Sequence, residues 1–186
     1  MPRYDADWIN QMLQPDLRGA PPAQRTIAQL GLQPGDVVAD IGCGPGFFTL
    51  PSARAVSPGG RVYAVDLEPK MLAVIRDRAQ REEIVGIETR QSRGLPIPLD
   101  DQIADWTICA LLLHDVDDRE ALVRELHRVT KPGGRIVVVE WLPGPNETRP
   151  NRMAPQITEG LLAITGRQIH QFEPLGTQQY LVVAEK

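Results

Sequence analysis

Short apolar runs alternate with longer amphipathic segments along most of the chain, as expected of successive strand–helix units around a mostly parallel sheet. Residues 136–139, Ile-Val-Val-Val, are apolar throughout, which is typical of a strand buried on both faces. The pattern therefore predicts an α/β fold. The expected strands span residues 37–41, 61–66, 85–90, 105–111 and 135–140.

The segments between these strands carry helix signals. Pro69 suits the first turn of a helix, and the apolar residues Met71, Leu72, Ile75 and Ala79 would then share one face. Ser-Pro-Gly-Gly at 57–60 and Lys-Pro-Gly-Gly at 131–134 should each stop a helix. The expected helices span residues 46–56, 69–82 and 118–130. Near the end of the chain, 168–172 and 179–184 are expected to form a closing pair of strands on either side of the turn-like residues 174–176.

Residues 1–22 and 143–155 do not fit this alternation. The first segment contains a short helical pattern over 5–13, with Trp8, Ile9, Met12 and Leu13 on one side. The second is rich in proline, asparagine and charge, and it reads as a loop. Irregular segments in compact domains are often functional, so we expect both to cover the active edge of the sheet, on the side where substrate enters.

The composition fits one compact domain, because 186 residues with 42% hydrophobic content can bury a sizeable core without disulfides or metals. A net charge of −4 makes nucleic acid an unlikely main partner, although a local basic patch stays open. Cys43 lies in a glycine-rich stretch and Cys109 in an apolar run, and these positions suggest that both are reduced thiols. No apolar stretch approaches the roughly 18 residues of a membrane span, and no metal-ligand spacing occurs. We therefore expect a single cytoplasmic domain, 1–186, with no metal site.

The loop after the first expected strand reads Asp-Ile-Gly-Cys-Gly-Pro-Gly at 40–46. Gly42, Gly44 and Gly46 allow a tight turn and a close approach by a ligand, in the place where open α/β sheets bind ligands. A phosphate-binding P-loop would need Gly-Lys-Ser/Thr, but this segment has no lysine. Dinucleotide binding prefers G-x-G-x-x-G, whereas Phe47 stands where the third glycine belongs. S-adenosylmethionine fits better, because Asp40 suits a cation and would repel a phosphate.

Asp66 ends the second expected strand about 20 residues beyond the loop, where a carboxylate can accept hydrogen bonds from both hydroxyls of a ribose. The alternative is that Asp66 only caps the helix that starts at Pro69. Asp40 has a structural alternative as well, as a carboxylate that holds its own loop. We expect Cys43 to be a small loop residue rather than a nucleophile, because nothing beside it would lower the pKa of its thiol.

Four motifs follow in order within residues 30–141: VADIGCGPGF, VYAVD, LPIP and VTKPGGR. With this order and spacing the chain resembles class I, Rossmann-like S-adenosylmethionine-dependent methyltransferases, especially the small bacterial branch that acts on small molecules. The resemblance implies a three-layer sandwich around a seven-stranded sheet whose last strand is antiparallel. It also implies that Asp40 and the glycine loop hold the methionine end of the cofactor, that Asp66 holds the ribose and that Leu67 covers the adenine. Many relatives place an acidic residue after the third strand; here Ser92 or Gln91 would have to contact the adenine instead.

His114 is the candidate catalytic base, since it should lie at the carboxyl end of the fourth strand and titrates near neutral pH. Alternatively, His114 is a loop residue that packs over the cofactor or forms a hydrogen bond with the backbone. On the substrate side, Glu140 is a candidate polar contact and Trp141 a stacking wall, although each could equally serve packing. Trp8 in the first irregular segment completes this predicted set.

These observations predict an enzyme that transfers a methyl group from S-adenosylmethionine to a small organic acceptor. A protein or RNA acceptor stays open, as does a cofactor-binding module that needs a partner subunit. A nicotinamide or nucleotide-sugar enzyme ranks third. Nothing in the chain indicates an oligomeric state.

Overall fold

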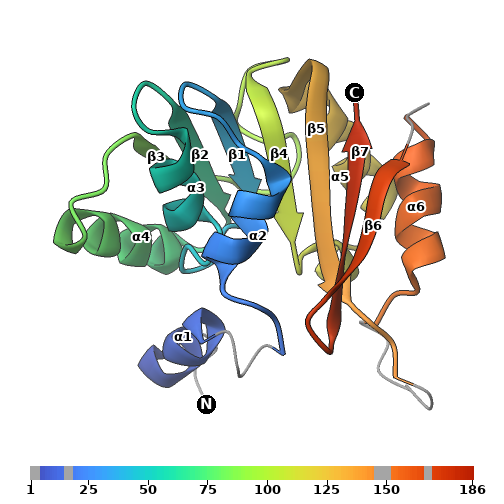
Figure 1. Ribbon diagram of the computed structural model, residues 1–186, viewed down its shortest axis with the longest axis horizontal. Helices are drawn as coiled ribbons and strands as arrows, with labels where there is room; N and C mark the ends of the chain where they lie inside the picture. The colour runs from blue at the N-terminus through green and yellow to red at the C-terminus, as the bar shows by residue number, and fades with distance from the viewer. Residues whose placement is uncertain (1–4, 15–18, 145–151, 166–168) are drawn as a thin grey trace.

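A seven-stranded sheet with strand order β3-β2-β1-β4-β5-β7-β6 forms the centre of the molecule (Figure 1). The computed structural model describes residues 5–14, 19–144, 152–165 and 169–186. Both β5 and β6 pair with β7 in antiparallel fashion, and the other pairs are parallel. The strands are β1 (Val37–Ile41), β2 (Arg61–Asp66), β3 (Ile87–Gln91), β4 (Ala104–Ala110), β5 (Thr130–Trp141), β6 (Ile169–Leu175) and β7 (Gln179–Glu185). This sheet confirms the expected Rossmann-like α/β fold with an antiparallel last strand.

Helices cover both faces of the sheet and complete three layers (Figure 1). On one face α2 packs on α3, and α3 contacts α4; on the other face α5 contacts α6. The helices are α1 (Ala6–Leu13), α2 (Ala23–Leu30), α3 (Thr49–Val56), α4 (Pro69–Arg81), α5 (Arg119–Val129) and α6 (Pro155–Ala163), with a short 3₁₀ turn, η2 (Leu113–Asp115). Both α2 and α6 went unpredicted, and α6 starts at the residue where the second irregular segment was expected to end.

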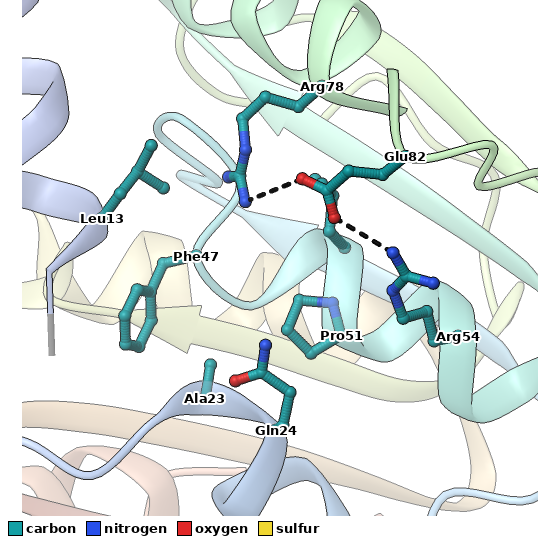
Figure 2. A pocket seen from close by; sticks show the side chains of 9 residues that line it. Leu13, Ala23, Gln24, Phe47, Pro51, Arg54, Arg78 and Glu82 are labelled. Atoms are coloured by element: carbon teal, nitrogen blue, oxygen red, sulfur yellow. Dashed lines mark hydrogen bonds and ion pairs between the residues drawn. The ribbon is translucent and has the colours of Figure 1, made fainter. Parts of the chain in front are cut away.

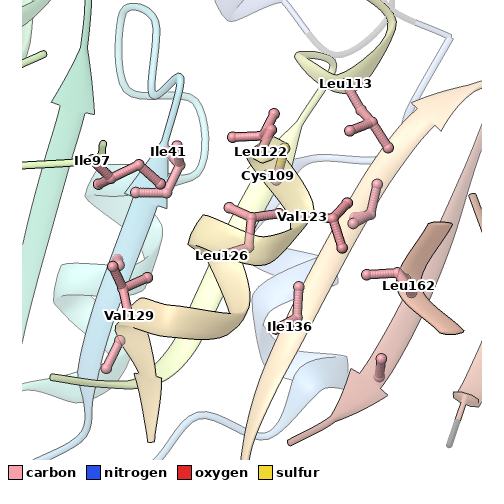
Figure 3. Close-up of a cluster of buried hydrophobic side chains, with 14 of the residues drawn as sticks. Ile41, Ile97, Cys109, Leu113, Leu122, Val123, Leu126, Val129, Ile136 and Leu162 are labelled. Carbon is pink, nitrogen blue, oxygen red and sulfur yellow. The ribbon is translucent and has the colours of Figure 1, made fainter. Parts of the chain in front are cut away.

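The apolar face of α5 shows why the pattern of the chain predicts its fold. Leu122, Leu126 and Val129 recur at helical spacing, are fully or almost fully buried, and pack toward β4 and β5 (Figure 3). The helix ends one residue earlier than expected, because Thr130 is already extended and its hydroxyl donates to the carbonyl of Leu126. As a result β5 begins at Thr130, and residues 131–134 belong to the strand.

Other helix and strand limits differ from the expected ones because of the local backbone conformation. The helix after β1 starts at Thr49 rather than Gly46, because three glycines with positive φ precede it and residues 44–48 form turns. Strand β3 starts at Ile87 rather than residue 85, since Gly86 has φ 82. At the far end β6 continues to Leu175, so the turn lies after it.

The carboxyl ends of the parallel strands meet at one edge of the sheet, the lower edge in Figure 1. The helix α1 and the chain that leaves β5 lie at this edge as well. Residues 15–18 and 145–151, which belong to the two irregular segments, lie outside the described residues. No helix in the described part of the chain has the length and apolar character to cross a bilayer.

Candidate functional site

The three glycines after β1 have different surroundings. All have positive φ: 70 at Gly42, 51 at Gly44 and 90 at Gly46. A Cβ at Gly42 would lie 2.7 Å from the side-chain end of Leu112, and one at Gly46 would lie 2.8 Å from that of Leu50, so either substitution would require the leucine to move. A Cβ at Gly44 would meet nothing within 4 Å. Gly44 is therefore the glycine that offers open space to a ligand.

The first amides of this loop bind the end of β2. The N–H groups of Gly42 and Cys43 donate to the carbonyl of Val65, at 2.8 and 3.0 Å. The N–H of Gly44 donates to Oδ2 of Asp66 at 2.8 Å. The glycine loop and Asp66 thus form one unit, although they are about 20 residues apart in sequence.

Asp66 is half-buried, and each of its carboxylate oxygens accepts one backbone hydrogen bond. Oδ1 accepts from the N–H of Glu68 at 2.8 Å, and Oδ2 from Gly44. A carboxylate has about four acceptor positions, so it can also accept from a pair of hydroxyls. Burial raises the pKa of Asp66 above its ordinary value, although the two amides oppose that shift. The cap of α4 is Glu68, which accepts from the N–H of Lys70, so the helix-capping alternative for Asp66 is wrong.

Asp40 is 2% exposed and accepts a 2.6 Å hydrogen bond from the hydroxyl of Thr49, the first residue of α3. Its carboxylate therefore ties the loop to the following helix, which is the structural role left open above. Burial raises the pKa of Asp40 to about 7; the Thr49 bond opposes this, and the charge of Asp66 adds to it. Sequence reasoning missed Thr49, and the only available signal was a hydroxyl in the first turn after the loop.

The remaining predicted cofactor residues differ in exposure. Cys43 is buried, and burial followed by the charges of Asp40 and Asp66 raises the pKa of its thiol well above the ordinary value, so it stays protonated. Leu67 follows directly after β2 and is 61% exposed, which is unusual for a large apolar side chain and suits a face that a flat ring would cover. Ser92 is buried beside Asp66. Its N–H donates to the carbonyl of Asp66, and its hydroxyl donates to the carbonyl of Gly94.

His114 lies in η2, just after β4, rather than on the strand itself. Leu111 precedes this turn with φ 55, which is uncommon for a non-glycine residue. Its neighbour Leu112 packs against Gly42. The backbone after β4 therefore places η2 directly beside the glycine loop.

The imidazole of His114 pairs with Glu140, near the end of β5. Nδ1 of His114 lies 2.7 Å from Oε2 of Glu140, and the His114 N–H donates to Oε1 at 3.2 Å. The side chains are 6% and 0% exposed. Burial lowers the pKa of His114, but the hydrogen bond and charge of Glu140, together with the charge of Asp115, outweigh it and raise the pKa above 6.5. Sequence reasoning found both residues but missed their pairing, and it assigned Glu140 to the substrate rather than to His114.

The two predicted tryptophans lie in different elements. Trp141 is half-buried next to Glu140, and the guanidinium of Arg152 lies 4.5 Å from its ring centroid. Trp8 is half-buried in α1. Arg152 also lies close enough to lower the pKa of His114, which makes it a neighbour that the sequence did not reveal.

A separate cavity of about 220 Å³ lies between α1, α2, α3 and α4 (Figure 2). Arg54 and Arg78 both pair with Glu82 there, at 3.1 and 3.5 Å. Arg78 also donates to the carbonyl of Pro45, which links this cavity to the glycine loop. None of the predicted site residues lines it. Among the described residues no group of His, Cys, Asp and Glu is arranged to hold a metal ion.

The residues at the glycine loop fit S-adenosylmethionine. Gly44 faces open space, Leu67 presents an exposed apolar side chain, and the carboxylates of Asp40 and Asp66 favour a cationic ligand without phosphate. Residues 39–138, more than half of the chain, match the family model described as a methyltransferase domain. This chain belongs to that family. The family and the fold together imply S-adenosylmethionine as the cofactor.

Among curated proteins, a demethylmenaquinone methyltransferase of Geobacillus sp. (strain WCH70) is 30% identical over 115 residues, 62% of this chain and 49% of that protein. The ubiquinone/menaquinone biosynthesis C-methyltransferase UbiE of Burkholderia cenocepacia (strain HI2424) is 38% identical over 116 residues, covering 62% and 47%. The chain spans about half the length of these relatives.

Solved structures support the fold. A SAM-dependent methyltransferase from Aquifex aeolicus superposes with a TM-score of 0.84 at 22% identity, covering 98% of this chain and 99% of that one. An arsenic(III) S-adenosylmethionine methyltransferase from Chlamydomonas reinhardtii gives 0.67 at 18% identity, covering 89% and 73%.

Proposed function

We propose that this methyltransferase domain transfers the methyl group of S-adenosylmethionine to a small organic acceptor. The observation that carries the proposal is the pairing of His114 with the buried Glu140 next to the glycine loop. Leu112, two residues before His114, lies against Gly42, so the pair would supply a proton-accepting group close to the glycine loop. The curated relatives are named for steps in quinone biosynthesis, which supports an acceptor of similar small size.

The roles of the residues follow from their positions. Asp66 would accept hydrogen bonds from the ribose, Leu67 would cover the adenine, and Gly44 would let the ligand approach the loop. Above about pH 7 Asp40 would supply negative charge behind the loop, while Cys43, Gly42 and Gly46 would maintain its shape. Ser92, with its hydroxyl bonded to Gly94, would act mainly by holding the chain beside Asp66.

S-adenosylmethionine supplies a methyl group on a cationic sulfur, so the protein mainly has to align an acceptor with that carbon. Alignment contributes about 7 to 11 kcal/mol to such reactions, whereas a general base adds roughly 3 to 5 kcal/mol. Trp141 and Trp8 would form walls of the acceptor site, and His114 would take up a proton.

The direct test is to incubate the purified chain with S-adenosylmethionine and a panel of small phenols, quinols, thiols and amines. Mass spectrometry should show a methylated product and S-adenosylhomocysteine. Binding of S-adenosylmethionine by calorimetry, together with no methylation of any compound in the panel, would count against the proposal and favour a binding module.

Two variants test the cofactor site. Asp66→Ala should weaken the binding of S-adenosylhomocysteine at least about tenfold, since it removes the acceptor of two hydroxyl hydrogen bonds. Asp77→Ala, at an exposed aspartate on α4, is the matched control and should bind normally. Equal affinity in the two variants would remove Asp66 from the ribose site.

Gly44→Ala should also weaken binding, because its Cβ would occupy the open space in front of the loop. Gly31→Ala is the control for backbone strain, since Gly31 also has positive φ and nothing within 4 Å of its Cβ position. The two variants should lose similar stability, and only Gly44→Ala should lose affinity. Normal affinity in Gly44→Ala would show that the ligand does not approach this glycine.

A further inference from the structure

Glu140 places a carboxylate at a fully buried position of the site. It lies within an otherwise apolar stretch of β5 with 0% exposure, and burial of a carboxyl group at such a position is unfavourable unless it is well bonded. Its oxygens accept from the N–H groups of His114 and Trp141, at 3.2 and 3.3 Å, and contact Nδ1 of His114 at 2.7 Å. Two of these three contacts therefore involve His114.

This contact decides which ring nitrogen of His114 carries a proton. A carboxylate only accepts hydrogen bonds, so Nδ1 must be the donor. In the neutral ring Nε2 then has a free lone pair. Nε2 lies 3.5 Å from Oδ1 of Asp115, whose side chain is 59% exposed, so this nitrogen is directed toward an exposed side chain.

We propose that Glu140 is a positioning residue that fixes the tautomer and charge of His114, so that Nε2 takes the proton of a phenol- or enol-type hydroxyl on the acceptor. This inference rests on the proposed function and narrows it to one substrate class. Neutral amines, and thiols, which ionise more readily than phenols, would gain less from the buried pair.

The proton balance of the step is complete with these groups. The acceptor hydroxyl gives its proton to Nε2 of His114 and keeps the bonding electrons. The resulting oxyanion, or the ring carbon conjugated with it, forms a bond to the methyl carbon, and the broken carbon–sulfur bond leaves its electrons on sulfur. When a ring carbon is methylated, it then loses its own proton to restore the ring, and the oxygen takes one proton back. In either case one proton finally passes from the site to water.

The charged surroundings of His114 favour this role. Glu140 on β5 and Asp115 on η2 raise its pKa, while burial and Arg152, which precedes α6, lower it. Cys109 on β4 and Tyr180 on β7 also feel the charge of Glu140, but burial raises the pKa of the thiol well above its ordinary value and that of the phenol to about 12, so both stay neutral. The net result is a more basic imidazole, better matched to a phenolic proton.

The test begins with the ligand-free chain, which has three histidines and therefore a simple imidazole spectrum. Long-range ¹H–¹⁵N spectra recorded across pH should show His114 protonated at Nδ1, with a pKa above 6.5. Glu140→Gln should lower that pKa, and Glu140→Asp, which keeps the charge, should restore part of the shift. Glu120→Gln, an exposed glutamate on α5, is the matched control and should leave His114 unchanged. An identical His114 titration in the wild type and in Glu140→Gln would overturn the positioning role.

Activity then tests the substrate class. Glu140→Gln should lower kcat on phenolic acceptors at least about tenfold, with KM nearly unchanged, and should shift the acid limb of the pH profile. The same variant should lose little activity on a thiol acceptor. An equal loss on both acceptors would overturn the assignment to hydroxyl acceptors. If the wild type methylates neither class, the proposed function itself fails, and the titration of His114 still decides the role of Glu140.

Discussion

Replacing Asp40 with asparagine should change how the stability of this domain depends on pH. The native pKa of Asp40 is about 7, against an ordinary value of 3.8, because the carboxyl group is buried. Between these two values the unfolded chain has already lost the proton that the folded chain keeps. The raised pKa therefore stabilises the fold fully below pH 3.8, and this contribution is lost as the pH rises to about 7.

The size of the effect follows from the shift. Each pKa unit corresponds to about 1.4 kcal/mol, so a shift of about 3 units corresponds to about 4 kcal/mol over the whole range. Between pH 5 and 7 the wild type should lose about 2 kcal/mol relative to Asp40→Asn, which has no proton to lose. Above about pH 8 the difference should stay constant. Asparagine can still accept the hydrogen bond from Thr49, so the comparison isolates the charge.

Urea unfolding at pH 5, 6, 7 and 8, followed by circular dichroism, measures this difference. The midpoint of Asp40→Asn should rise relative to the wild type by about 1 M urea or more between pH 5 and 7. Asp117→Asn, at an exposed position, is the matched control and should track the wild type. A constant difference between Asp40→Asn and the wild type across this range would refute the reasoning, because it would mean that Asp40 is ionised throughout.

Three further outcomes are expected. Thr49→Val removes the 2.6 Å donor to Asp40, so the pKa of Asp40 should rise and the pH at which stability stops falling should move above 7. If the same urea series shows stability levelling off at the wild-type pH, this expectation is contradicted. Because the pKa of His114 is raised, its pairing with Glu140 stabilises the fold below pH 6.5 and this contribution is lost as the pH rises through the native pKa. Glu140→Gln should therefore lose more stability at pH 5.5 than at pH 8.5, by about 1 to 3 kcal/mol, and a loss independent of pH would argue against the pair. Gly42→Ala should lower Tm more than Gly31→Ala, because only its Cβ would strike Leu112, and equal Tm values would show that Leu112 moves aside.

The regular part of the fold was predictable because it depends on local periodicity. The limits of β1 and β2 were predicted correctly, since apolar runs there end at clear turn signals. Three of the four residues predicted for the apolar face of α4, Met71, Leu72 and Ile75, are buried, and Ala79 is half-buried. By contrast, α6 begins after a segment rich in proline and charge, and its existence depends on packing against β7 and α5.

The site was predictable residue by residue but not as an arrangement. The acidic and glycine positions follow from spacing, yet the bond between Gly44 and Asp66 joins residues 22 apart, and that between His114 and Glu140 joins residues 26 apart. Such pairs depend on which strands are neighbours and on the backbone turn at Leu111, where φ is 55. A leucine in the sequence gives no signal for a positive φ. The role of Asp40 as the partner of Thr49 was likewise visible only once α3 was in place.

The negative charge behind the glycine loop has a consequence for turnover. Above pH 7 the charges of Asp40 and Asp66 would both attract the cationic sulfur of the proposed methyl donor, whereas S-adenosylhomocysteine lacks that charge. The loop should therefore release the spent nucleoside more readily than it releases the donor, which limits product inhibition. Salt weakens attraction between charges, so the ratio of the two dissociation constants should become smaller as ionic strength rises.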